Sequence, residues 1–256
     1  MQSNCDSMIK INEKLNERYR QQQDGIFEAD EEQNLRMVAQ SYALCENAIA
    51  VLSNLRTDMS HIYYGKVGDI LGFDTSTSYQ IVNSVWEEDI YARIHPDDWR
   101  MRCLQELSFF RMVSTAHSKD TYAWHLENTM RMRDAKGRYH NVLHRIFYFT
   151  GRNKTGICYS LCLYNIAVGG DRTAHLVNTL TGERKLLEVD GSGLLTERER
   201  EILLLIREGK SSLTISERFC ISKHTVDRHR QNIIAKLQVN NTTEACHKVK
   251  SLGLIE

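Results

Sequence analysis

The sequence predicts an α+β protein, in which N-terminal helices and an antiparallel sheet domain precede an all-α domain of four helices. Between residues 48 and 167, short apolar runs with strand-like alternation are joined by turns rich in Gly, Asp and Asn. After Gly193 the alternation stops, and helix-capping residues precede apolar positions at helical spacing. A chain of 256 residues is long enough for two domains of ordinary size.

Residues 1–46 are predicted to form a polar, helical N-terminal extension. In its second half, four residues recur at helical spacing and make one apolar stripe: Leu35, Val38, Tyr42 and Cys45. Such a helix either covers the neighbouring domain or pairs with a copy of itself in a dimer. The sequence leaves both alternatives open.

Residues 47–168 are predicted to form the sheet domain. Two short strands, "AIAVLS" and "HIYYG", are followed by a mixed helical stretch and then by three longer strands. The longer strands are joined by "DAKG" and "GRNKTG", as expected of hairpin connections. Residues 169–193 are assigned to a linker that contains a candidate hairpin turning at Thr181 and Gly182.

Three segments of this domain resemble a PAS domain: "AIAVLSNLRTDMSHIYYGKVGDILGF", "RIHPDDW" and the closing "LCLYN". The resemblance implies a module that senses a signal or dimerises, and many PAS domains enclose a cofactor or small metabolite. No residue identifies such a ligand, so the cofactor is unknown. Pro96 is the single proline of the chain and is expected in the first turn of a helix, with Asp97 and Asp98 at the positive end of its dipole.

No group of residues in the sequence has the spacing of a metal site. Cys158 and Cys162 share a strand face but lie about 13 Å apart along it, too far for a disulfide or a common ion. His140 and His144 have the same spacing and are excluded for the same reason, and His125 is expected to be structural or exposed. We therefore predict that the protein has no metal site.

Catalytic and membrane functions are also not expected. The sequence has no nucleophile–base pair and no Gly-rich phosphate loop, so we predict no catalytic residue and no enzymatic activity. No apolar run reaches about 18 residues, and the N-terminus lacks the apolar core of a signal peptide. Seven scattered cysteines fit reduced thiols, and the expected location is the cytoplasm.

The C-terminal domain is predicted to span residues 194–256 and to contain four helices defined by their caps. The cap signals are the pair Thr196 and Glu199, then Ser211 or Ser212, then Ser222, and finally the pair Asn241 and Glu244. A tight "FCIS" corner separates the second helix from the third. Two helices joined in this way have the outline of a helix-turn-helix.

The third helix, residues 223–237, is predicted to have an apolar face and a polar face. Val226, Ile233 and Leu237, with the stem of Arg230, are expected to pack inward. The opposite face carries four residues able to bind base edges in a major groove: His224, Asp227, Arg228 and Gln231. Six flanking residues are expected to contact phosphates: Lys223, Thr225, His229, Arg230, Asn232 and Lys236.

Positive charge is concentrated in this part of an otherwise neutral chain. The whole sequence has 33 basic and 33 acidic residues, whereas residues 218–250 have seven basic and two acidic ones, a net charge of +5. Residues 194–217, with four basic and five acidic residues, have a net charge of −1. The charge therefore lies on the segment that would contact DNA. By itself, the charge also fits a solvated basic face.

Three segments, "LLTEREREILLLIREGKSS", "ISKHTVDRHRQNIIAKL" and "NNTTEA", resemble the LuxR-type (FixJ/NarL-like) helix-turn-helix domain of bacterial transcription regulators. The resemblance covers about 65 residues. It implies that the third helix enters the major groove and that the fourth helix makes a dimer contact, here through Ala245, Val249 and Leu252. Two positions depart from the family: Thr214-Ile215-Ser216 replaces a usual Glu-Ile-Ala sequence, and Asp227 stands where a basic or neutral residue is common.

These observations favour a dimeric transcription factor that binds double-stranded DNA at an inverted repeat and responds to a small molecule or protein partner through its PAS-like domain. The alternative is a protein-interaction module, in which the basic helix is a docking surface for a partner protein. The alternative predicts no salt-sensitive DNA binding.

Overall fold

The computed structural model describes residues 29–115, 123–150, 156–187, 189, 195–237 and 239–251. The chain divides into two compact units after Leu187. The first unit is built around an antiparallel sheet and the second is helical, which confirms the predicted order of a sheet domain and a helical domain. The N-terminal half of the predicted helical extension, residues 1–28, lies outside the described residues.

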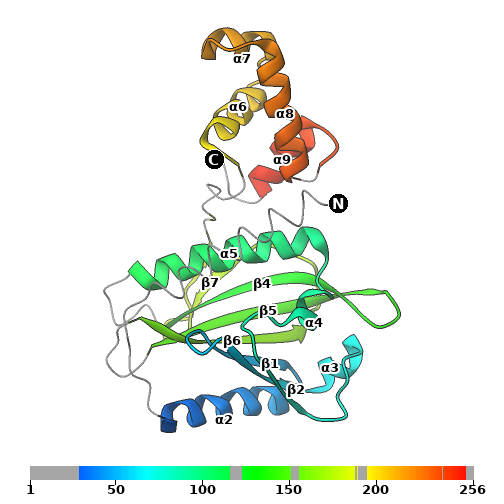
Figure 1. Cartoon of the computed structure of the whole chain (residues 1–256), viewed down its shortest axis with the longest axis vertical. Coiled ribbons are helices and arrows are strands. Elements are labelled where there is room, and N and C mark those ends of the chain that lie inside the picture. Colours follow the sequence, from blue (N-terminus) through cyan, green and yellow to red (C-terminus); the bar gives the residue numbers. More distant parts are fainter. Residues whose placement is uncertain are drawn as a thin grey trace. The chain divides into compact units, whose positions relative to one another are not determined.

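A single antiparallel sheet with the order β3-β2-β1-β6-β5-β4-β7-β8 forms the centre of the first unit (Figure 1). Its strands are β1 (Ile49–Asn54), β2 (Met59–Tyr64), β3 (Tyr79–Val82), β4 (Trp124–Arg133), β5 (Tyr139–Thr150), β6 (Ile157–Ile166), β7 (His175–Asn178) and β8 (Arg184–Leu186). The first strand pairs with the sixth, with Ile49 opposite Tyr164. This pairing joins the early hairpin to the later meander in one sheet.

The edges of the sheet differ from the sequence prediction, although the pairing of β7 with β8 confirms the predicted hairpin at Thr181 and Gly182. The edge strand β3 lies within the stretch predicted as mixed helical, and its four residues are too few and too exposed to show a clear alternation. The predicted linker contributes β7, which pairs with β4, and β8, which pairs with β7. The turn between these two strands contains Gly182, whose φ of +73° is readily adopted only by glycine. The first unit therefore extends to Leu187, beyond the predicted end of the sheet domain at residue 168.

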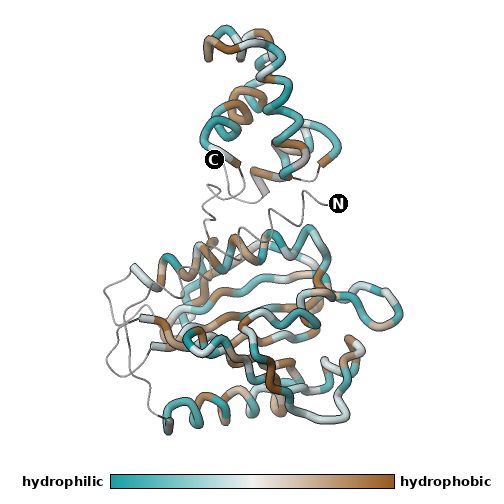
Figure 2. The backbone as a smooth tube through the Cα atoms, viewed as in Figure 1, coloured by the Kyte–Doolittle hydropathy of each residue, from teal (hydrophilic) through white to brown (hydrophobic). Residues whose placement is uncertain are grey.

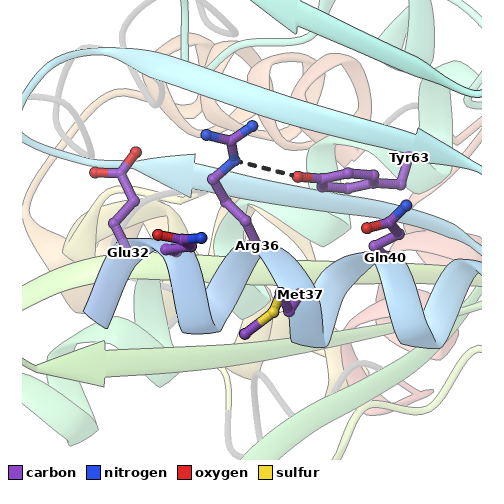
Figure 3. Close-up of a pocket in the computed structure, with 6 residues that line it drawn as sticks. Glu32, Arg36, Met37, Gln40 and Tyr63 are labelled. Carbon is purple, nitrogen blue, oxygen red and sulfur yellow. Dashed lines mark hydrogen bonds between the residues drawn. The ribbon is translucent and has the colours of Figure 1, made fainter. Parts of the chain in front are cut away.

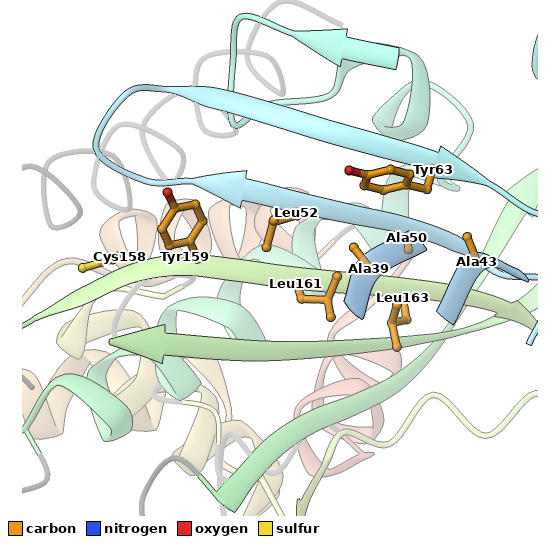
Figure 4. Packing of buried hydrophobic residues seen from close by; sticks show 9 residues of the cluster. All are labelled: Ala39, Ala43, Ala50, Leu52, Tyr63, Cys158, Tyr159, Leu161 and Leu163. Carbon is orange, nitrogen blue, oxygen red and sulfur yellow. The ribbon is translucent and has the colours of Figure 1, made fainter. Parts of the chain in front are cut away.

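Helix α2 (Ala29–Cys45) covers one face of the sheet at β1 and β2. Ala39 and Ala43 are buried against Leu52, Leu161 and other residues of β1 and β6 (Figure 4). Leu35 and Tyr42 pack at the edge of this cluster, as the predicted stripe requires. The other two members of that stripe are on the outer surface: Val38 is 40% exposed, and Cys45 is exposed. Two small alanines, which the apolar spacing did not single out, make the close contact instead.

Helix α2 carries a polar pocket on the side toward β2 and an apolar surface on its outer side. The pocket lies between the helix and Tyr63, where Arg36 donates a hydrogen bond to the Tyr63 hydroxyl at 3.4 Å (Figure 3). Arg36 also donates to the hydroxyl of Tyr79 at 3.2 Å. Farther along the helix, Met37 is 53% exposed and Leu44 is 72% exposed. Helix α2 therefore covers the sheet with one side and presents apolar side chains on the other.

The opposite face of the sheet is covered by α3 (Lys66–Leu71), α4 (Glu88–Tyr91) and α5 (Pro96–Thr115) (Figure 1). Helix α5 begins at Pro96, as the sequence predicts. Asp98 is not a free charge at the helix dipole, because its carboxylate accepts hydrogen bonds from Arg131 of β4 at 2.8 Å. Hydrophilic residues alternate with hydrophobic ones along α5 (Figure 2). Among the described residues, no helix is long and apolar enough to cross a membrane.

Candidate nucleic-acid interface

The second unit contains α6 (Glu197–Arg207), α7 (Ser212–Phe219), α8 (Lys223–Leu237) and α9 (Thr242–Ser251). Side-chain caps precede each helix at the positions that the sequence indicates. Thr196 and Glu199 form a reciprocal capping box, with hydrogen bonds of 3.2 and 2.8 Å. The other three caps are Ser211 on the N–H of Thr214, Ser222 on the N–H of Thr225, and Asn241 on the N–H of Glu244.

The four helices share one apolar core. Its members are Ile202, Leu203, Ile215, Val226, Ile233, Leu237, Ala245 and Val249, none of which is more than 3% exposed. Three of them come from α8, at a spacing that places them on one side of the helix. Burial of this side fixes which face of α8 is directed to solvent.

A left-handed residue makes the corner between α7 and α8. Cys220 has φ +51° and ψ +40°, so the chain turns there without a glycine. On the other side of the corner, the guanidinium of Arg198 lies 3.6 Å from the centroid of the Phe219 ring and reaches the Phe219 carbonyl. This contact anchors α7 to α6. The Thr214 hydroxyl lies 2.9 Å from that of Ser211, so this side chain interacts with the cap of its own helix.

The outer face of α8 carries the four residues predicted to contact bases. His224, Arg228 and Gln231 are exposed, and Asp227 is half-buried. Their positions i, i+3, i+4 and i+7 place them on one side of the helix. No hydrogen bond or ion pair to another described residue occupies these four side chains. They are therefore free to contact an external ligand.

The predicted phosphate-contacting residues fall into two groups. Lys223 and Asn232 are exposed beside the outer face. Thr225, His229 and Arg230 are half-buried, and the Arg230 Nε and His229 Nδ1 atoms are enclosed by protein. The Arg230 stem thus contributes to packing, as its position next to the apolar face predicts.

Lys236, which was predicted to contact phosphate, is engaged within the domain. Its Nζ atom lies 2.6 Å from Oε2 of Glu199, the buried capping residue of α6. Burial opposes ionisation of Glu199, but the hydrogen bonds from Lys236 and Thr196 outweigh burial and lower the pKa of this carboxyl. The Lys236 ammonium therefore compensates a carboxylate that is nearly inaccessible to water, and it ties α8 to the start of α6.

We expect Lys236→Met to lower the free energy of unfolding of the helical unit by about 1 kcal/mol, because a charged hydrogen bond to Glu199 is lost. The loss is no larger because the Lys236 side chain is 40% exposed and water already screens this ion pair. The slope of log K against log salt for DNA binding should stay unchanged. Lys223→Ala is the matched control, since its exposed ammonium should reduce that slope by about 1. Thermal unfolding and DNA titration at two salt concentrations measure both effects. A reduced slope at unchanged stability would place Lys236 at the phosphates after all.

The apolar stripe of α9 is used inside the domain, which corrects its assignment to a dimer contact. Ala245 is fully buried and Val249 is 1% exposed, and α9 packs against both α6 and α8. These two side chains complete the core of their own domain and are not accessible to a second chain. Leu252, the third predicted member of the stripe, lies outside the described residues.

A second group of polar residues, inside the first unit, was not found by sequence reasoning. Between α5 and the sheet, the Arg102 Nη2 atom lies 2.8 Å from Glu106 Oε1, and both side chains are at most 4% exposed. Glu87 and His144 are also buried nearby. Burial raises the pKa of both carboxyls and lowers that of the His144 imidazole. Since these residues come from α5, β5 and the residue that precedes α4, only the folded unit brings them together.

Comparison with known families agrees with the geometry of the helical unit. Residues 193–249 match the family described as bacterial regulatory proteins, luxR family. The transcriptional activator SolR of Ralstonia nicotianae is 39% identical over 66 residues, which are 26% of this chain and 28% of SolR. The transcriptional regulatory protein LiaR of Bacillus subtilis is 49% identical over 51 residues, 20% of this chain and 24% of LiaR. The helical unit is thus similar to the luxR-family regulatory domain, and the relatives that match it are described as a transcriptional activator and a transcriptional regulatory protein.

The similarity to these relatives covers only about a quarter of their length. Among solved structures, VqmA of Vibrio cholerae aligns over 84% of this chain and 86% of its own, with 13% identity and a TM-score of 0.31. SdiA of Escherichia coli aligns over 95% and 97%, with 14% identity and a TM-score of 0.26. These scores are too low to assign the fold of the first unit.

Proposed function

We propose that this chain is a dimeric, cytoplasmic transcription regulator, in which α8 reads the major groove of an inverted-repeat DNA site. The observation that carries the proposal is the outer face of α8. Arg228, His224 and Gln231 are exposed and unengaged there, while the opposite side of the same helix is sealed in the core of a luxR-family domain. Arg228 is suited to a guanine, and Gln231 to an adenine.

We assign the first unit to a PAS-like sensory module on the basis of its strand order. An early hairpin, β1–β2, is followed by three helices and by the meander β4–β5–β6, whose last strand returns to pair with β1. This is the connectivity expected of a PAS domain. The strand β3 and the β7–β8 hairpin extend the sheet at its two edges. A small molecule or a protein partner would act through this module.

Selection from random duplex DNA by the full-length protein tests the function. The expected result is an enriched palindrome, whose affinity falls steeply when the salt concentration is raised. Binding without enrichment would mean that the protein contacts DNA only through its charge. Absence of salt-sensitive binding would favour the alternative function, in which the exposed face of α8 docks a partner protein.

The dimer contact requires a surface other than the buried stripe of α9, and we propose the outer side of α2. Met37, Ser41 and Leu44 follow one another at i, i+4 and i+7, and Val38 and Cys45 lie beside them seven residues apart. An apolar seam of this spacing can pack against the same seam of a second chain, parallel or antiparallel, because a two-fold axis places the same surface on both partners.

Leu44→Glu is therefore expected to convert the dimer to a monomer, because a carboxylate would be placed in an apolar contact between the chains. Leu213→Glu is the matched control, since Leu213 is another strongly exposed leucine but lies on α7 of the helical unit. Sedimentation of the two variants at several protein concentrations distinguishes them. A dimer that survives Leu44→Glu would rule out α2 as the contact.

A further inference from the structure

We propose that Glu106, His144 and Cys162 form a buried binding site for one divalent transition-metal ion, of the class represented by Zn²⁺. The three residues come from α5, β5 and β6, and all are buried. Their ligand atoms, a carboxylate oxygen, an imidazole nitrogen and a thiol sulfur, lie within 4.8 Å of one another. If the ligand atoms moved about 1 Å closer to one another, their separations would be those of a tetrahedral site with metal–ligand bonds of about 2.0–2.3 Å.

The hydrogen bonding of His144 leaves the right nitrogen free. Nδ1 of His144 lies 3.2 Å from the side-chain oxygen of Asn128, and the Asn128 amide nitrogen donates to Gln105. Since the Asn128 oxygen can only accept, Nδ1 carries the proton and Nε2 has a free lone pair. Nε2 is fully buried, has no hydrogen-bond partner among the described residues, and lies 4.0 Å from the Glu106 carboxylate. Metal-binding histidines have their second nitrogen held by a fixed acceptor in the same way.

The local charges favour a cation over an anion. Two carboxylates, Glu87 and Glu106, are buried near a single guanidinium, that of Arg102. The Arg102 charge is paired with Glu106 and also faces the rings of Tyr91 and Trp99 at 4.8 and 5.4 Å. The Glu87 carboxyl accepts hydrogen bonds from Ser53 (3.2 Å) and Ser60 (2.6 Å), while Arg102 and Glu106 balance each other. A divalent ion together with a Cys162 thiolate would add one positive charge, and Glu87 is the buried acid that could balance it.

The available space is that of an ion. A cavity of about 20 Å³ borders two of the proposed ligands, Glu106 and Cys162, but not His144. Its volume suits a single ion or water molecule and is far below that of a metabolite. A mixed set of nitrogen, sulfur and oxygen ligands selects Zn²⁺ and its transition-metal neighbours over Mg²⁺ and Ca²⁺, which prefer oxygen alone. Binding forms a metal–sulfur bond and releases the Cys162 thiol proton to solvent.

Cobalt(II) titration of the reduced, chelator-treated full-length protein tests the site. We expect uptake of about one equivalent per chain, with a thiolate-to-cobalt charge-transfer band in the near ultraviolet. Cys162→Ser should abolish this band. His144→Asn should weaken cobalt binding at least tenfold, because it keeps a donor toward Asn128 but removes Nε2. Cys103→Ser is the control, since Cys103 is also buried on α5 but lies outside the site.

Far-ultraviolet circular dichroism and thermal melting establish whether each variant is folded. If a variant is not folded, cobalt uptake by the parent protein alone tests the site. Parent protein that takes up no cobalt, or takes it up without a thiolate band, would overturn the proposal. So would a band that persists in a folded Cys162→Ser variant or disappears in Cys103→Ser.

Discussion

Replacing Glu106 by Leu is expected to destabilise the metal-free first unit by about 3–5 kcal/mol. Arg102 would then retain its charge in an interior where it is 2% exposed, because a guanidinium does not lose its proton at any ordinary pH. Its Nε and Nη1 atoms already lack hydrogen-bond partners among the described residues, so the Glu106 carboxylate at 2.8 Å is its main compensation. The cost is that of an uncompensated buried charge.

The double variant Arg102→Met/Glu106→Leu should be more stable than Glu106→Leu alone, because it removes the stranded charge together with its partner. Urea unfolding of the parent, both single variants and the double variant, all in the presence of a chelator, measures the coupling between the two residues. If the double variant lost as much free energy of unfolding as the two single variants lose together, the two residues would not be coupled. Helix packing alone would then explain the destabilisation.

The helical unit was largely predictable from sequence because its signals are local. A cap and its partner, such as Thr196 and Glu199, are three residues apart, and the buried side of α8 follows from a 3.6-residue period. The same local reasoning identified the exposed face with His224 and Arg228.

The sequence is least informative in this unit where a residue's partner is distant along the chain. Lys236 and Glu199 are 37 residues apart, so nothing near α8 indicates that this ammonium is engaged. The α9 stripe is short, and only the packing of α9 on α6 and α8 shows that Ala245 and Val249 complete a core.

The polar interior of the first unit could not be predicted for the same reason. Along a single strand, the nearest candidate partner of Cys162 is Cys158 and that of His144 is His140. The relevant neighbours are across strands: β5 and β6 pair with Ile146 opposite Cys162 and His144 opposite Tyr164, so His144 and Cys162 are diagonal neighbours. Register between strands, together with the position of α5 over the sheet, creates the site.

Arg228→Ala is expected to weaken binding to the selected DNA site by about 1–3 kcal/mol, roughly 5- to 150-fold, and to relax specificity at one base pair. Arg228 is exposed on the outer face of α8 and has no hydrogen-bond or ion-pair partner among the described residues, so its removal leaves the helix core of Val226 and Ile233 unchanged. The reason for the large effect is that a guanidinium can donate two parallel hydrogen bonds to a guanine, and alanine can donate none.

Lys223→Ala separates base reading from charge. Lys223 is also exposed, at the start of α8, but it flanks the base-facing side. Its loss should weaken binding to all sequences alike and lower the salt dependence. Repeating the DNA selection with both variants provides the measurement: the Arg228 variant should accept any base at one position of each half-site, and the Lys223 variant should return the parental site. If the Arg228 variant also returned the parental site at full affinity, α8 would be rotated relative to the groove, and a flanking residue such as Asn232 would be the base reader.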